Sequence, residues 1–173
     1  MDRIQLANRV EQEAKDSFGG TRLVDFLRTG WRSATDSVKK TFCDLGRELG
    51  FQVAAAGYRG ADQGEWLYDM VWYVLEDGLM VRQALVLESE WKHGVPVGQS
   101  VEVDDDFQKL VQARADVRVW ISTSPNPQMA RQHITNCKTQ VAKFSGTVPG
   151  DTYLFIIADW TSASTIVERF EAA

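Results

Sequence analysis

The chain has 173 residues, 44% hydrophobic content and six tryptophans, which is enough for one well-filled core and too little for two ordinary domains. Its formal charge of -5 argues against a protein that coats nucleic acid non-specifically, because neutralisation of phosphates dominates such binding. There is no apolar run of about 18 residues and no basic-then-apolar leader, so we expect a cytoplasmic protein with no membrane partner.

Helical patterns occupy the first part of the chain. Residues 2–17 and 21–32 are predicted to be helical, with two glycines between them. The next helix is predicted to begin near Thr35 or Asp36 and to end at Gly50. Its apolar stripe recurs at spacings of four, three and four residues and consists of Val38, Phe42, Leu45 and Leu49.

A short strand and a β-hairpin are predicted next. The first strand covers 51–56, and the hairpin strands cover 66–75 and 79–92. Asp77-Gly78 is typical of a two-residue hairpin turn. The aromatic residues at 66, 68, 72 and 73 could stack on bases, but such residues more often form the core of a sheet.

The turn fixes an expected register for the hairpin. If Glu76 pairs with Leu79, the numbers of paired residues sum to 155 throughout the hairpin. Asp69 would then face Val86 and lie diagonal to Glu88, with about 7–8 Å between the two backbones. A slip by one residue would move Asp69 to the other face of the sheet.

Two helix-strand units are predicted after the hairpin. Residues 101–106 lead into a helix with an acidic start, and 117–121 form the next strand. A further helix opens at 124–127, and 152–160 is a near-continuous apolar strand. The roughly 25 residues between strands match a helical crossover, so these strands should pair in parallel.

Charged residues at alternate positions on the second hairpin strand are the main functional signal. Glu88, Glu90 and Lys92 share one face because a strand has a period of two, and Asp69 on the neighbouring strand shares it as well. Buried unpaired carboxylates cost several kcal/mol or become protonated, and a divalent cation would relieve that cost. The acid excess of the whole chain lies in this region, since residues 51–110 hold 11 acidic and 4 basic side chains.

In these residues the chain resembles the PD-(D/E)XK nuclease superfamily, in which an Asp on the second strand and a Glu or Asp with Lys on the third bind Mg²⁺ and activate water. The resemblance covers roughly residues 35–160 and implies an α/β fold with a restriction-endonuclease-like αβββαβ core. Such a core has a mixed sheet, with an antiparallel hairpin and parallel crossover strands flanked by helices. Residues 1–32 would be an N-terminal helical extension of a single domain over 1–173. Residues 106–110 are reminiscent of segments in members of the superfamily, whereas Tyr68 stands where the family usually has Pro.

The family pattern implies a Mg²⁺-dependent endonuclease that acts on DNA, with Mn²⁺ as a substitute ion, and it fits this chain in two registers. In the first, Glu90 is the metal ligand and Lys92 orients or activates the attacking water. In the second, Glu88 is the ligand and Glu90 stands where the family usually has Lys. The hairpin register places Glu88 nearer to Asp69 and favours the second, whereas a β-bulge in the long third strand would favour the first.

Other interpretations of the same residues remain open. Glu88, Glu90 and Lys92 are also compatible with the solvated end of a strand, where an exposed ion pair contributes about 0–1 kcal/mol. A further metal ligand from the first core helix would be Glu48 or Asp44, and the helical phase does not choose between them. The alternative function is a catalytically inactive interaction or regulatory protein on the same scaffold.

Overall fold

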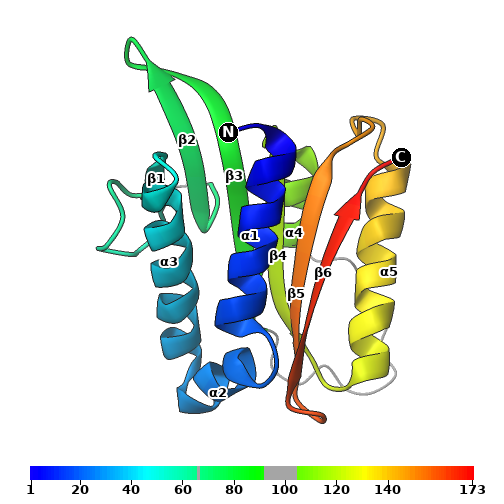
Figure 1. Cartoon of the computed structure of the whole chain (residues 1–173). Helices are drawn as coiled ribbons and strands as arrows, with labels where there is room; N and C mark the ends of the chain where they lie inside the picture. The colour runs from blue at the N-terminus through cyan, green and yellow to red at the C-terminus, as the bar shows by residue number, and fades with distance from the viewer. Residues whose placement is uncertain (66, 92–104) are drawn as a thin grey trace.

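The computed structural model describes residues 1–65, 67–91 and 105–173, and these form one six-stranded mixed sheet with helices on both faces (Figure 1). The helices are α1 (Arg3–Phe18), α2 (Arg22–Thr29), α3 (Trp31–Glu48), α4 (Asp105–Gln112) and α5 (Pro127–Lys143). The strands are β1 (Gln52–Ala55), β2 (Met70–Glu76), β3 (Leu79–Glu90), β4 (Val117–Ser124), β5 (Thr152–Asp159) and β6 (Ser164–Glu171). The chain is therefore an α/β protein.

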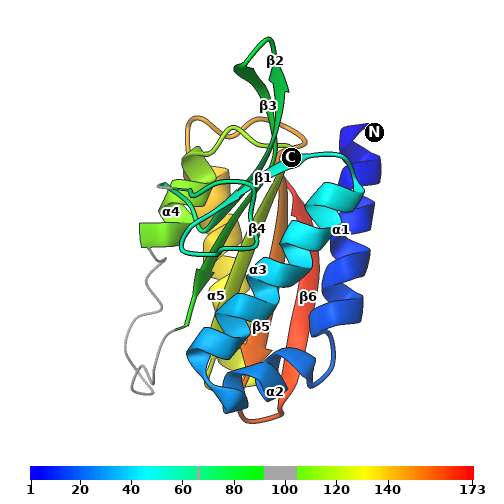
Figure 2. The same ribbon diagram turned by 90° about the vertical axis from the view of Figure 1, so that its left-hand side faces the viewer.

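The strands lie in the sheet in the order in which they occur in the chain. β1, β2 and β3 pair antiparallel, β3, β4 and β5 pair parallel, and β6 returns antiparallel to β5. Figure 2 shows the sheet nearly edge-on, with α1, α2 and α3 on one side and α4 and α5 on the other. The predicted antiparallel hairpin and the two parallel crossovers are confirmed.

Each face of the sheet has its own hydrophobic core. Under α1, α2 and α3, the buried Trp72 ring lies between Phe42 and Phe51, with ring centroids 6.4 Å and 5.9 Å away. Under α4 and α5, Phe107 contacts the rings of Trp120 and Phe155 at 5.6 Å and 6.0 Å. Because helices cover both faces, every residue of β5 is buried, which explains its continuous apolar sequence.

The boundary between the second and third helices differs from the sequence-based prediction. α2 ends at Thr29, and α3 already begins at Trp31, before the predicted start at Thr35 or Asp36. Gly30 separates them with a φ of 133°, a backbone conformation that glycine adopts without the steric cost of a Cβ atom. The earlier start adds a turn to α3 and places Arg32 and Thr35 on this helix.

The hairpin has the predicted turn but not the predicted register. Glu76 pairs with Leu79 as expected, but register shifts between Trp72 and Tyr73 and between Val74 and Leu75 change the pairing beyond them. Val86 consequently faces Val71, and the prediction that it faces Asp69 is wrong. The total displacement is two residues, and beyond the shifts the paired residues Trp72 and Leu85 both face the core under α1, α2 and α3.

The last strand predicted from the sequence ends at residue 160, and β6 beyond it was not predicted. This edge strand pairs with β5 along its whole length, from Asp159 with Ser164 to Thr152 with Glu171. None of its eight residues is buried, and charged side chains interrupt its apolar positions. A one-sided, partly exposed edge strand lacks the continuous apolar run by which β5 was recognised.

Candidate functional site

Asp69 lies in the bend before β2 and is held by the end of β3. Its Oδ2 accepts hydrogen bonds from the Ser89 backbone N–H at 2.8 Å and from the Ser89 hydroxyl at 2.6 Å. Its Oδ1 lies 3.4 Å from Nζ of Lys39 on α3. The Asp69 carbonyl also accepts a hydrogen bond from the backbone N–H of Ala56 at 2.9 Å, which continues the pairing of β1 with β2.

Lys39 connects α3 to this bend. The side chain is buried, and its Nζ donates a 2.6 Å hydrogen bond to the carbonyl oxygen of Ala56 in addition to its ion pair with Asp69. A lysine is seldom fully buried unless it is paired, and here one carbonyl and one carboxylate satisfy it. Lys39 therefore supplies a fixed positive charge beside Asp69.

Glu88 lies two residues before the end of β3 and is only 4% exposed. Lys109 on α4 lies with its Nζ 2.9 Å from Oε1 of Glu88 and 2.7 Å from Oδ1 of Asp106. The contact with Glu88 is therefore an ion pair with a side chain that also binds Asp106. Within the described residues, Oε1 is buried without a hydrogen-bond partner.

The surroundings of Glu88 change its acidity. The pKa of Glu88 is raised from 4.5 to about 7 as the net result of opposing effects. Burial raises the pKa most, the contact with Lys109 lowers it, and the negative charge of Asp69 raises it. Burial alone would lower the pKa of Lys109, but the carboxylates of Asp106 and Glu88 raise it above its ordinary value. Near neutral pH, Glu88 is thus partly protonated, and a cation bound beside it would stabilise its charged form.

The structure brings Asp69 and Glu88 near each other without joining them in one ion pair. Asp69 pairs with α3 and Glu88 with α4, and these helices cover opposite faces of the sheet. The prediction that the two carboxylates share one face is therefore wrong, because the bend before β2 directs Asp69 to the side chain of Ser89, which alternates with Glu88 along β3. The two carboxylates still interact through their charges, as the pKa of Glu88 indicates. Both lie where β3 ends, and the carboxyl ends of parallel strands are where open α/β sheets bind ligands.

The remaining predicted site residues have different positions. Glu90 is half-buried at the last position of β3, opposite Ser122 of β4. Lys92 lies outside the described residues, so the register that uses Glu90 and Lys92 stays a prediction. On α3, Glu48 pairs with Arg9 at 2.8 Å and Asp44 pairs with Lys40 at 2.5 Å, so both of these acids contact basic residues at the surface.

Two lysines and a serine at this site were not assigned by the sequence analysis. Lys39 lies next to Val38 and three residues before Phe42, at the border of the buried stripe of α3. Ser89 lies between the two glutamates and faces the opposite side of β3. Lys109 lies on α4 and pairs with Asp106 and Glu88.

The donor chemistry at Asp69 and Glu88 suits a hard cation. Among the residues that the structure describes, no three His, Cys, Asp or Glu side chains form a group that could hold a metal ion. Mg²⁺, however, usually keeps several waters and binds through one or two carboxylates, together with the phosphates of its substrate. Two carboxylates, each already paired with a lysine, fit a Mg²⁺ ion that keeps several waters and not a closed protein cage.

Comparison of the chain with protein-family models, with curated proteins and with solved structures gave no significant match. In the described part of the chain, no helix has both the length and the apolar character needed to cross a membrane.

Proposed function

We propose that this protein is a Mg²⁺-dependent phosphodiesterase with a restriction-endonuclease-like core, acting on DNA. The observation that carries the proposal is the buried carboxylate of Glu88 beside Asp69 at the end of β3, with its pKa raised to about 7. A carboxylate in such a place is costly to the fold and is therefore a candidate for function. The element order from α3 to β5 agrees with the αβββαβ arrangement and supports the proposal.

Asp69 and Glu88 would hold the ion, with Glu90 as a further ligand or base. The bound Mg²⁺ would supply an activated water and neutralise charge on the phosphate. Lys109 is 37% exposed and also pairs with Asp106, so it can leave Glu88 without being buried unpaired. Lys39 is fixed by the Ala56 carbonyl and would present its charge to a phosphate bound beside Asp69.

A specific observation favours a second function. Both carboxylates already pair with lysines, and no three-ligand group exists among the described residues. The same scaffold would then be a catalytically inactive interaction or regulatory protein, whose acid-lysine pairs serve stability. Because removal of one partner of a buried pair leaves an uncompensated charge, such pairs can be retained without any metal chemistry.

Thermal unfolding with and without divalent ions separates the two functions. We expect Mg²⁺ or Mn²⁺ to stabilise the wild type, since an ion that binds only the native state at about 100 times its Kd adds about 2.7 kcal/mol. Asp69→Asn should abolish this stabilisation because it removes an anionic ligand. Asp25→Asn is a matched control on α2, where Asp25 pairs with Arg28, and should respond as the wild type does. If divalent ions do not raise the thermal stability of the wild type, or raise that of Asp69→Asn by the same amount, the result would favour the inactive scaffold.

A further inference from the structure

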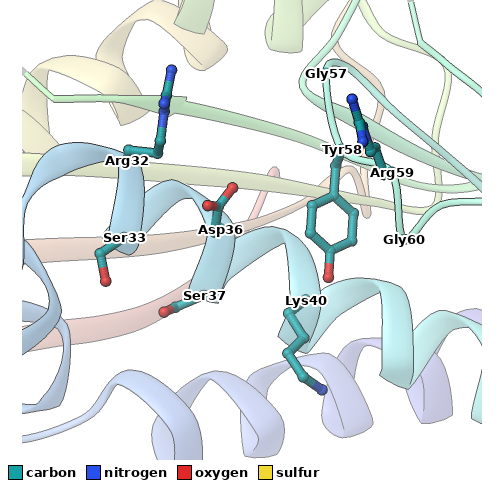
Figure 3. A pocket seen from close by; sticks show the side chains of 9 residues that line it. All are labelled: Arg32, Ser33, Asp36, Ser37, Lys40, Gly57, Tyr58, Arg59 and Gly60. Atoms are coloured by element: carbon teal, nitrogen blue, oxygen red, sulfur yellow. The ribbon is translucent and has the colours of Figure 1, made fainter.

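An open groove lies between the first half of α3 and the turn formed by residues 57–60. Its volume is about 990 Å³. The lining residues are Arg32, Ser33, Asp36, Ser37, Lys40, Gly57, Tyr58, Arg59 and Gly60 (Figure 3). The lining holds three basic side chains and one acidic side chain, in a protein whose formal charge is -5.

The basic side chains of the groove differ in how well they are neutralised. Lys40 pairs with Asp44 at 2.5 Å, so its charge is partly offset. Arg32 and Arg59 are exposed, and neither forms an ion pair within the described part of the chain. Figure 3 shows Arg32 on α3 and Arg59 on the turn with both guanidinium groups directed to the upper side of the view, whereas Lys40 points away from them.

The turn that carries Arg59 is held in place by the rest of the fold. Asp62 just after it accepts a 2.8 Å hydrogen bond from the Val53 backbone and pairs with Arg47 at 2.8 Å. Gly60 lies against the Tyr58 ring so closely that a Cβ there would be 2.5 Å from a ring carbon. The half-buried Tyr58 is thereby fixed as part of the groove wall.

The groove adjoins the elements that hold Asp69, although neither Asp69 nor Glu88 lines it. Residues 32, 36 and 40 lie on one stripe of α3, because side chains four apart in a helix share a face. The adjoining stripe contains Thr35, which accepts a 2.8 Å hydrogen bond from Trp91, and Lys39, which pairs with Asp69. Ala56, which contacts both Lys39 and Asp69, immediately precedes the turn.

We infer that this groove binds the sugar-phosphate backbone of a nucleic-acid strand, with Arg32 and Arg59 contacting phosphates on the strand that reaches Asp69. Arginine guanidinium groups match phosphate geometry and remain charged at all working pH values. An open, polar groove is suited to a chain that passes through it, whereas small-molecule sites enclose most of their ligand in apolar walls. The bound strand is a substrate only if the protein is the proposed phosphodiesterase, so this part of the inference rests on the proposed function.

Binding of DNA to the groove can be measured by fluorescence anisotropy in EDTA. The probe is a labelled single-stranded DNA of about 20 nucleotides, which is longer than the site size of a typical binding module. Under these conditions no metal-dependent cleavage occurs. The double variant Arg32→Ala/Arg59→Ala should bind about tenfold more weakly, and the slope of log affinity against log salt should fall by about 0.7 for each phosphate that the variant no longer neutralises. Arg28→Ala, which removes an exposed arginine paired with Asp25 on α2, should bind as the wild type does.

Equal affinity and salt dependence for the wild type and the double variant would overturn the inference, as would equal losses in the double variant and Arg28→Ala. Thermal unfolding of each variant in buffer confirms that the exposed substitutions leave the fold intact. Because the assay excludes metal, its result is separate from that of the ion-induced thermal shift. An ion-induced shift without groove-dependent DNA binding would retain the metal site and reject the groove, and the reverse result would retain the groove and reject the phosphodiesterase.

Discussion

Asp69→Asn should reduce Mg²⁺-dependent nicking of supercoiled plasmid DNA by more than about 100-fold, since even loss of an outer partner of a metal ligand costs 10–100-fold. The substitution replaces an anionic oxygen with a neutral amide of the same size. The amide oxygen can still accept hydrogen bonds from the Ser89 backbone and hydroxyl, so the bend before β2 should persist. The assay compares initial nicking rates in Mg²⁺, Mn²⁺ and EDTA.

The same assay distinguishes the two registers of the motif. If Glu88 and Glu90 form the working motif, Glu88→Ala should remove both metal binding and cleavage, and Lys92→Ala should cost much less. If Glu90 and Lys92 form it, Lys92→Ala should abolish cleavage and leave metal affinity largely intact, because lysine acts on the phosphate and water. Metal-dependent cleavage that persists in all of the Asp69, Glu88, Glu90 and Lys92 variants would refute both registers.

Glu88→Gln should make the free energy of unfolding less sensitive to pH. The pKa of Glu88 is raised in the folded state from 4.5 to about 7, so the folded protein binds this proton more tightly than the unfolded chain does. The resulting stability is fully present below pH 4.5 and is lost as the pH rises through 7. One pKa unit corresponds to about 1.4 kcal/mol, which sets an upper bound of roughly 3 to 4 kcal/mol on the loss.

Urea unfolding at pH 5 and pH 8 in EDTA measures this effect. Relative to the wild type, Glu88→Gln should gain stability on going to pH 8, because a neutral side chain has no charge to bury. Glu76→Gln, at an exposed position near the hairpin turn, should follow the wild-type profile. Parallel pH profiles for the wild type and Glu88→Gln would contradict the assignment of the titration to Glu88. Excess Mg²⁺ should restore stability to the wild type at pH 8, where the ionised carboxylate is available to bind it.

Much of the fold could be predicted because its elements are marked by strong local patterns. The continuous apolar sequence of β5 and the Asp77-Gly78 turn each indicate one structure, and both occur as expected. The register of β2 on β3 could not be predicted, because no glycine or proline in either strand marks its two shifts. β6 escaped prediction for a related reason, since an edge strand with no buried residue carries little hydrophobic signal.

The acidic residues of the candidate site could be predicted from the sequence, but the basic residues that pair with them could not. The period of two along β3 identified Glu88 and Glu90, since alternate residues share a face. The partners of the carboxylates come from α3 and α4, far from Asp69 and Glu88 in the sequence. Local pattern does not show which lysine of a basic stretch turns inward, and the pairing of Lys39 with Asp69 depends on how α3 lies across the start of β2.

A crystal of the protein soaked in Mn²⁺ tests the proposed metal site most directly. We predict an anomalous peak within about 2.5 Å of carboxylate oxygens of both Asp69 and Glu88, a typical distance for a hard cation and its oxygen ligands. Lys109 should then have moved away from Oε1 of Glu88 and should retain its contact with Asp106. A map without a peak at these carboxylates, with Lys39 and Lys109 still paired to Asp69 and Glu88, would contradict the proposal and favour the inactive scaffold.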